Sequence, residues 1–197
     1  MGKNIVKSMK KIAIFASGSG TNAENITTYF KGNSEVEISL IICNKPEAYV
    51  LERARQLGIP SEVIAGADMK DEAKVMQILR NFNIDFIVLA GYLVRIPSYL
   101  IAAYPRAIVN IHPSLLPLHG GKGMYGERVH EDVLRCGEKE SGITVHYVNE
   151  ELDSGATIFQ AKCPVLPDDT PHSLAARVHE LEYTHYPRVI AETIAKL

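Results

Sequence analysis

The sequence contains no tryptophan, only 7% aromatic residues and three cysteines in 197 residues. Cys43, Cys136 and Cys163 are far apart in the chain, odd in number and without CxxC spacing. This arrangement predicts neither a disulfide framework nor a zinc site. We therefore expect three inert, buried thiols and no bound metal.

An excess of one charge and long apolar runs are also missing. Lys and Arg number 21 against 23 Asp and Glu, a formal net charge of −2, so the surface is not expected to bind nucleic-acid phosphates. No stretch approaches the roughly 18 apolar residues of a membrane-spanning helix. Lys3, Lys7, Lys10 and Lys11 precede an apolar run, 12–16, that is too short for a signal peptide. We expect a cytoplasmic protein with no nucleic-acid or membrane partner.

The composition that remains is that of an ordinary globular protein. Hydrophobic residues make up 46% and charged residues 22% of the chain, which argues against disorder and against a coiled coil. A length of 197 residues suits one α/β core, and no linker, repeat or low-complexity tract interrupts it. We expect residues 1–197 to form a single domain.

Short apolar runs alternate with amphipathic segments up to about residue 111. The predicted strands are 11–16, 36–43, 62–65, 85–90 and 107–111, and the predicted helices are 23–29, 49–57, 71–82 and 97–103. This alternation predicts an α/β fold with a Rossmann-like, mostly parallel sheet that has helices on both faces.

The last third of the chain has a different pattern. After a predicted helix over 127–135, the segments 142–148 and 156–163 predict an antiparallel strand pair near the C-terminus. Thr170 is expected to cap a final helix from about Pro171, and Pro187 is expected to interrupt or kink that helix.

A glycine-rich turn connects the first predicted strand to the first helix. It consists of Gly18, Ser19, Gly20, Thr21 and Asn22. Glycines allow the backbone to approach an anion, and the helix start supplies free amides, so phosphate is the expected ligand. Ala23 completes the GxGxxA form of the dinucleotide fingerprint, but residues 43–45, Cys-Asn-Lys, lack the acid that binds a ribose. A dinucleotide site and a structural turn remain the alternatives.

A polar residue and a histidine alternate where the fifth predicted strand ends, in 110–117, Asn-Ile-His-Pro-Ser-Leu-Leu-Pro. The spacing places Asn110 and His112 on one side of an extended segment, at the strand end where open α/β sheets bind ligands. A structural histidine is the alternative reading.

Asp153 lies in the loop between the last two predicted strands, beside Ser154-Gly155. Such an aspartate is commonly part of a turn. An Asn to stabilise an oxyanion, a His to move a proton and an Asp to set the state of that His would nevertheless suit acyl transfer without a covalent intermediate. A serine nucleophile is disfavoured, because no Gly-x-Ser-x-Gly motif is present.

The stretch 110–117, together with Asp153 in Glu-Leu-Asp-Ser-Gly, resembles the formyltransferases that use 10-formyltetrahydrofolate. The resemblance runs from about Lys11 to the C-terminus and is strongest to the members that act on glycinamide ribonucleotide in purine synthesis. It implies direct attack of the substrate amine on the formyl carbon through an oxyanion intermediate. It also implies 10-formyltetrahydrofolate as co-substrate, no metal, and a monomer or homodimer.

The resemblance further assigns roles to residues. Asn110, His112 and Asp153 match the catalytic trio, residues 18–22 match the loop that holds the substrate phosphate, and Glu182 matches the glutamate that contacts the glycinamide end. The residues matching the folate site are Lys70, Leu93, Val94, Arg95, Ile96, Asn110, Val148, Asn149, Glu150, Glu151 and Leu152. Arg95 is displaced from the arginine position of many members. The loop 118–126 is longer than in most and suggests a mobile lid.

The runner-up functions are a formyltetrahydrofolate hydrolase and another formyltransferase, such as the methionyl-tRNA enzyme. The resemblance gives the hydrolases an N-terminal regulatory domain and the tRNA enzymes a C-terminal RNA-binding domain, and 197 residues are expected to leave no room for either. A nucleotide-binding module or dehydrogenase is an alternative from another class, which the missing ribose acid disfavours.

Overall fold

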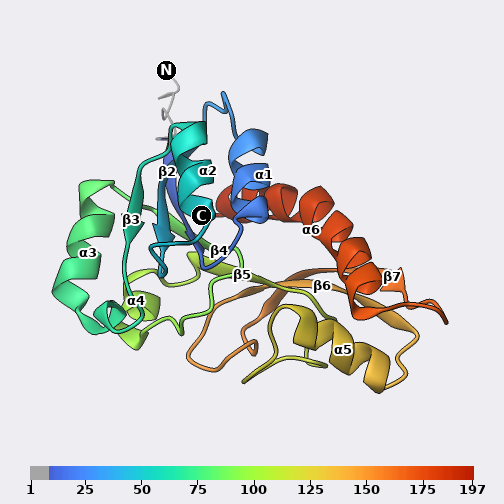
Figure 1. Cartoon of the computed structure of the whole chain (residues 1–197). Helices are drawn as coiled ribbons and strands as arrows, with labels where there is room; N and C mark the ends of the chain where they lie inside the picture. The colour runs from blue at the N-terminus through green and yellow to red at the C-terminus, as the bar shows by residue number, and fades with distance from the viewer. Residues whose placement is uncertain (1–8) are drawn as a thin grey trace.

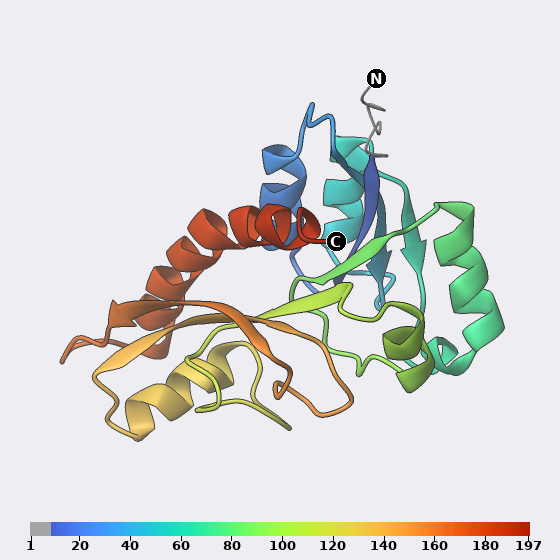
Figure 2. The same ribbon diagram turned by 180° about the vertical axis from the view of Figure 1, so that it is seen from behind.

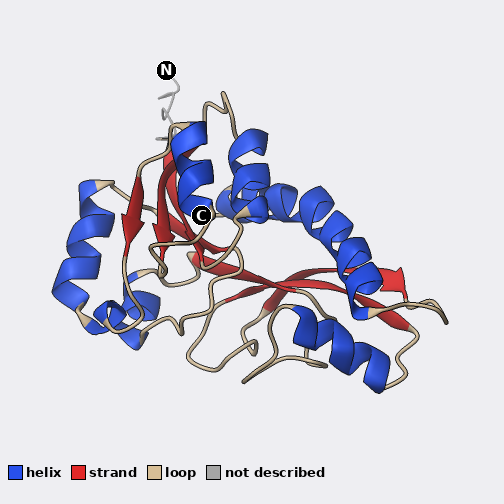
Figure 3. Cartoon of the chain, viewed as in Figure 1, coloured by secondary structure: helices blue, strands red, loops and turns tan. Residues whose placement is uncertain are grey.

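The computed structural model describes residues 9–197, so Lys3 and Lys7 lie outside the described residues. Within that range the chain forms a seven-stranded sheet in the order β3-β2-β1-β4-β5-β6-β7 (Figure 3). Its strands are β1 (Lys10–Ala16), β2 (Val36–Cys43), β3 (Ser61–Val63), β4 (Phe86–Leu89), β5 (Ile108–His112), β6 (Glu140–Tyr147) and β7 (Thr157–Pro164). β1 to β5 pair in parallel, whereas the β5–β6 and β6–β7 pairs are antiparallel. The predicted fold class and the C-terminal strand pair are confirmed.

Helices cover both faces of the sheet, as predicted (Figures 1 and 2). They are α1 (Thr21–Tyr29), α2 (Val50–Leu57), α3 (Glu72–Asn81), α4 (Ser98–Ala103), α5 (Glu127–Arg135) and α6 (Pro171–Ile194), with a short 3₁₀ helix η1 (Asp68–Lys70). Successive strand residues point to opposite faces. Ile12 and Ile14 therefore pack with α1, α2, α5 and α6, whereas Ala13 and Phe15 pack with α3 and α4. Within residues 9–197, the helices are all too short or too polar to cross a bilayer.

Pro187 lies inside α6 without interrupting it, so of the two expected outcomes, a break or a kink, the break is wrong. Thr170 caps this helix as predicted, accepting a hydrogen bond from the backbone N of Ser173 at 3.2 Å. Proline has no N–H, so the carbonyl of Tyr183 loses its helical donor. Asn25 Nδ2 of α1 donates to that carbonyl at 3.0 Å. The freed carbonyl is thus satisfied between helices, and α6 continues as one curved helix (Figure 1).

Tyr186 anchors α6 to the carboxyl edge of the sheet. Its side chain is fully buried, and its hydroxyl donates to the carbonyl of Leu89, the last residue of β4, at 2.8 Å. Burial raises the pKa of this hydroxyl well above its usual value, so it remains a donor. The contact holds the helix turn that carries Glu182 beside the strand ends where a ligand site is expected.

His130 of α5 is buried against α6 and predicts a pH-dependent stability. It is 3% exposed, its Nδ1 has no hydrogen-bond partner, and burial, followed by the charge of His179, lowers its pKa to about 4. The unfolded chain takes up this proton near pH 6.5, whereas the folded chain does so only near pH 4. Stability is therefore lost as the pH falls through this window.

We expect the free energy of unfolding of the parent, relative to a His130→Gln variant, to fall by about 2 kcal/mol between pH 7 and pH 5. Urea unfolding of both proteins at the two pH values measures this difference. His172→Gln, at an exposed position of α6, is the matched control. A parent-to-variant difference that is the same at both pH values would contradict the prediction.

Candidate active site

The glycine-rich turn and the start of the predicted folate stretch meet at the carboxyl edge of the sheet. β2 and β3 extend from β1 in one direction and β4 and β5 in the other, which makes the β1–β4 junction the topological switch point. Ser17 N donates to the carbonyl of Gly91 at 3.0 Å, and Leu93 N donates to Ser17 Oγ at 2.8 Å. These bonds hold the two loops together at the junction.

The turn between β1 and α1 has the geometry of an anion site. Gly20 has φ +77°, and a Cβ there would lie 2.4 Å from Cγ2 of Val50, so both conformation and packing require glycine. Val50 N donates to the carbonyl of Gly18 at 3.1 Å, and Arg53 Nε donates to that of Ser19 at 2.9 Å. No side chain caps the start of α1, so its first amides are available to an anion.

Glu182 lies against this turn, although it is 160 residues away in the chain. Its Oε2 accepts a hydrogen bond from Asn22 Nδ2 at 2.7 Å, and the residue is 4% exposed. His179 Nδ1 lies 2.8 Å from the same oxygen, and this bond raises the pKa of His179. Asn22 Oδ1 is buried without a hydrogen-bond partner, an acceptor that is left for a ligand donor. The glycine-rich turn and Glu182, both predicted to bind the substrate, thus form one wall of the candidate site.

Asn110 and His112 lie at the end of β5, as predicted. His112 is 4% exposed, and its Nε2 donates to the carbonyl of His119 at 2.8 Å. A carbonyl oxygen can only accept, so Nε2 carries a hydrogen. The other ring nitrogen, Nδ1, faces Asp153 Oδ2 at 3.6 Å. Nδ1 is therefore the nitrogen of His112 that is free to exchange a proton.

Asp153 projects between two histidines from the β6–β7 loop. Its Oδ1 lies 3.7 Å from His146 Nε2, and its Oδ2 accepts a hydrogen bond from Gly121 N at 2.8 Å. A Cβ on Gly155 would lie 1.7 Å from the carbonyl of Tyr147, so the loop can close this tightly only with glycine there. A hollow of about 340 Å³ opens beside the carboxylate, between the Leu152–Gly155 segment and the turn after β5.

His146 is a site residue that the sequence analysis missed. It lies opposite Asn110 in the β5–β6 pairing, and its Nε2 is 3.2 Å from Asn110 Nδ2. Its Nδ1 donates to the carbonyl of Tyr147 at 2.9 Å, and burial lowers its pKa, so the ring is neutral at pH 7. The available signal was the alternation of Thr144 and His146, two polar side chains on one face of a predicted strand.

Thr144 fixes the turn that follows β5. Its Oγ1 donates to the carbonyl of Ser114 at 2.7 Å and accepts from Leu116 N at 3.0 Å. Ser114 Oγ donates in turn to the carbonyl of Leu118 at 2.7 Å. The backbone between His112 and His119 is thereby held in the conformation that presents the His119 carbonyl to His112.

The two main stretches of predicted folate residues lie side by side. Arg95 donates to the carbonyl of Glu150 at 2.5 Å, and Asn149 Oδ1 accepts from Glu151 N at 3.1 Å. Leu93 and Leu152 are 52% and 50% exposed, which leaves apolar surface beside these two stretches.

The other predicted folate residues are placed less favourably for direct contact. Ile96 is 5% exposed and belongs to the core, against which Val94 and Val148 pack. Lys70 is exposed at the end of η1, and within residues 9–197 its side chain makes no hydrogen bond to the other predicted folate residues. β2 ends at Cys43 and is followed by Asn44 and Lys45, so the ribose acid of a dinucleotide site is missing, as predicted.

Comparison of the sequence with known proteins identifies several related ones. A sequence model of the formyl transferase family matches residues 10–190. A phosphoribosylglycinamide formyltransferase of Bacillus subtilis (strain 168) is 39% identical over 191 residues, which cover 94% of this chain and 95% of that protein. A chloroplastic phosphoribosylglycinamide formyltransferase of Arabidopsis thaliana is 41% identical over 187 residues, which cover 92% of this chain. The chain spans 64% of that plant protein and 60% of a second one, from Vigna unguiculata.

A solved structure supports the same relationship. The phosphoribosylglycinamide formyltransferase from Bacillus halodurans, known from a crystal structure, is 38% identical in sequence to this chain. The two structures superpose with a TM-score of 0.85, and the match covers 95% of this chain and 96% of that one. Because the family match covers most of the chain and the Bacillus relatives match it over nearly their full length, this chain belongs to the formyl transferase family.

Proposed function

We propose that the chain transfers the formyl group of 10-formyltetrahydrofolate to the amine of glycinamide ribonucleotide. The observation that carries this proposal is the meeting of Asn110, His112 and Asp153 at the end of β5, on the same sheet edge as the phosphate-type turn. The names of these related proteins support it, because they are phosphoribosylglycinamide formyltransferases. The arrangement brings together Asn110, which can donate a hydrogen bond to an oxyanion, and His112, which can carry a proton.

In the proposed reaction the uncharged amine attacks the formyl carbon, and the carbonyl oxygen becomes an oxyanion. The second N–H of Asn110 and the protonated ring of His112 stabilise this charge, since donors preorganised at an oxyanion contribute strongly to catalysis. The bond from carbon to N10 then breaks, and the proton lost by the attacking nitrogen ends on N10. Asp153, 3.6 Å from His112 Nδ1, stabilises the imidazolium and helps relay this proton.

The remaining binding roles are part of the same proposal. Residues 18–22 bind the substrate phosphate through the amides at the start of α1, and Glu182 receives the glycinamide end. Folate lies between the exposed stretches around Leu93 and Leu152, with Asn110 at its reactive end. Lys70 and Ile96 belong to the proposed folate site as well: Lys70 lies at the edge of this site and Ile96 lies beneath it.

The broader expectations also stand as proposals. Residues 1–197 form one domain, which the uninterrupted family match over 10–190 supports. The partners are the two small molecules, with no nucleic acid or membrane and no metal in the reaction, and the protein is a monomer or homodimer. A cytoplasmic location is proposed, whereas the names of the plant relatives assign those proteins to the chloroplast.

The first experiment asks which nucleophile accepts the formyl group. We expect deformylated folate, followed by its absorbance, to form only when glycinamide ribonucleotide is present, because in this proposal Glu182 and the phosphate turn bind that substrate. Product formed at the same rate without the amine would indicate a hydrolase and overturn the proposal.

An Asn110→Ala variant tests the oxyanion role. We expect turnover to fall about 100-fold or more while the protein stays folded, since losing one oxyanion donor typically costs roughly 3 to 4 kcal/mol. Steady-state kinetics measure the loss, and circular dichroism checks the fold. Asn81→Ala, at an exposed position of α3, serves as the control. Near-parent turnover of Asn110→Ala would remove Asn110 from the mechanism.

A Glu182→Gln variant tests the proposed contact of Glu182 with the glycinamide end of the substrate. The amide keeps the size of the side chain but loses the charge that faces the glycinamide end. We expect KM for glycinamide ribonucleotide to rise about 10-fold, as for a lost hydrogen bond to a charged group, with KM for folate unchanged. Glu180→Gln, exposed on the same helix, is the control. An effect on KM for folate alone would contradict the assignment.

A further inference from the structure

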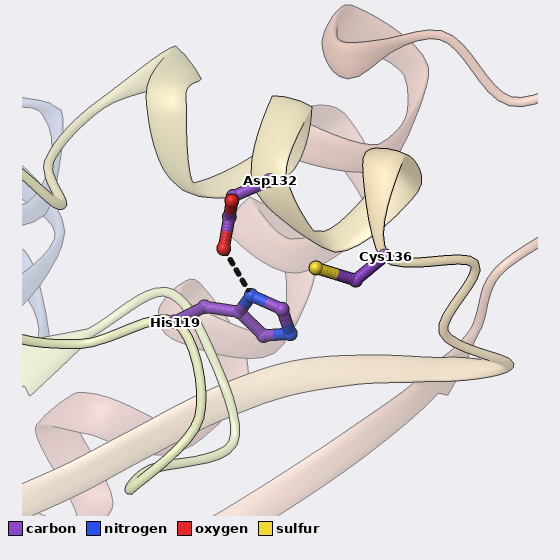
Figure 4. Close-up of side chains that lie close together, drawn as sticks. All are labelled: His119, Asp132 and Cys136. Atoms are coloured by element: carbon purple, nitrogen blue, oxygen red, sulfur yellow. Dashed lines mark hydrogen bonds and ion pairs between the residues drawn. The ribbon is translucent and has the colours of Figure 1, made fainter.

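A cluster of metal-ligand side chains lies outside the proposed active site, at the end of α5 (Figure 4). It consists of His119, from the loop after β5, and of Asp132 and Cys136, one helical turn apart on α5 and its C-cap. One ligand atom of each residue lies within 4.8 Å of those of the other two. The expectation of no zinc site rested on cysteine spacing alone, and that spacing does not detect a mixed His, Asp and Cys set.

His119 supplies the second observation. Its side chain is 8% exposed, and its Nε2 is buried without a hydrogen-bond partner. Nδ1 donates to Asp132 Oδ2 at 2.6 Å, so Nε2 is the unprotonated nitrogen of the neutral ring. Leaving such an acceptor unpaired costs free energy. A metal ion that binds at Nδ1, on the side of Asp132, moves the ring hydrogen to Nε2, which can then donate to Glu138 Oε1, 3.4 Å away.

Two carboxylates flank His119, with Asp132 Oδ2 at 2.6 Å from Nδ1 and Glu138 Oε1 at 3.4 Å from Nε2. Arg135 bonds the other oxygen of Asp132, and its side chain is 73% exposed and free to turn into solvent. A hollow of about 360 Å³, lined in part by His119 and Glu138, lies beside the cluster and has room for a water.

We propose that His119, through Nδ1, Asp132 and Cys136 bind a thiophilic divalent cation of the zinc type, with water completing the coordination. Imidazole, carboxylate and thiolate together are typical ligands of tetrahedral Zn²⁺ and are a poor set for Mg²⁺ or Ca²⁺. Binding replaces the thiol proton of Cys136 with the metal and releases that proton to solvent. The ion takes no part in formyl transfer, although the His119 carbonyl accepts the hydrogen bond from His112 Nε2.

Cobalt substitution tests the proposal on the full chain without a histidine tag. Co²⁺ takes the same ligands as Zn²⁺ and, unlike that d¹⁰ ion, it absorbs light. We expect one equivalent of Co²⁺ to produce visible bands of a tetrahedral site and a near-ultraviolet thiolate-to-cobalt band, both removed by Zn²⁺. His119→Gln and Cys136→Ser should each weaken Zn²⁺ binding at least about 10-fold, as measured against a chromophoric chelator. Cys163→Ser, a buried thiol of β7 outside the cluster, should bind as the parent does.

A second measurement uses the parent protein alone, so it does not depend on how the variants fold. Cys43 and Cys163 are buried, as expected, whereas Cys136 is exposed, so the expectation of a buried thiol is wrong there. Mass spectrometry after treatment with iodoacetamide should show that Zn²⁺ slows alkylation of Cys136, with the buried thiols as internal references. Absence of a thiolate-to-cobalt band, or equal alkylation of Cys136 with and without Zn²⁺, would overturn the proposal.

Discussion

The antiparallel pairing of β6 with β5 is the constraint on which the candidate active site depends. Because β6 pairs antiparallel to β5 with His146 opposite Asn110, the loop after β6 begins beside β5, where Val148 N donates to the carbonyl of Ile108 at 3.0 Å. From there the loop carries Asp153 to within 3.6 Å of His112 Nδ1. The pairing of one strand therefore brings together an acid and a histidine that are far apart in the chain.

The position of Glu182 beside the phosphate turn depends on a second feature, the anchoring of α6 across the strand ends. Tyr186 bonds the end of β4, Asn25 of α1 bonds the Tyr183 carbonyl that Pro187 leaves free, and Glu182 meets Asn22. The proline thus creates an acceptor that links α6 to α1 instead of ending the helix. These contacts, all between residues far apart in the sequence, keep Glu182 at the phosphate turn.

Local pattern explains which parts of this arrangement could be predicted from the sequence. Strand and helix periodicity, the glycine turn and the spacing of Asn110 and His112 are properties of neighbouring residues, and the structure has them where they were expected. His146 depends on strand register, the continuity of α6 depends on Asn25 in another helix, and the His119 cluster joins a loop to a helix end. Each depends on a partner from another element of the fold, and even the alternation of Thr144 and His146 could not show that His146 lies opposite Asn110.

The pairing with β6 also decides how Asn110 presents its amide. The carbonyl of Tyr147 can only accept, so the hydrogen of neutral His146 lies on Nδ1, and Nε2 is left as an acceptor. Asn110 must then direct its NH₂ group, not its oxygen, toward His146, since two acceptors would repel each other. The same NH₂ group keeps a second hydrogen, which is available to a developing oxyanion. A backbone carbonyl thus sets the tautomer of His146, and that tautomer determines which atom of Asn110 donates.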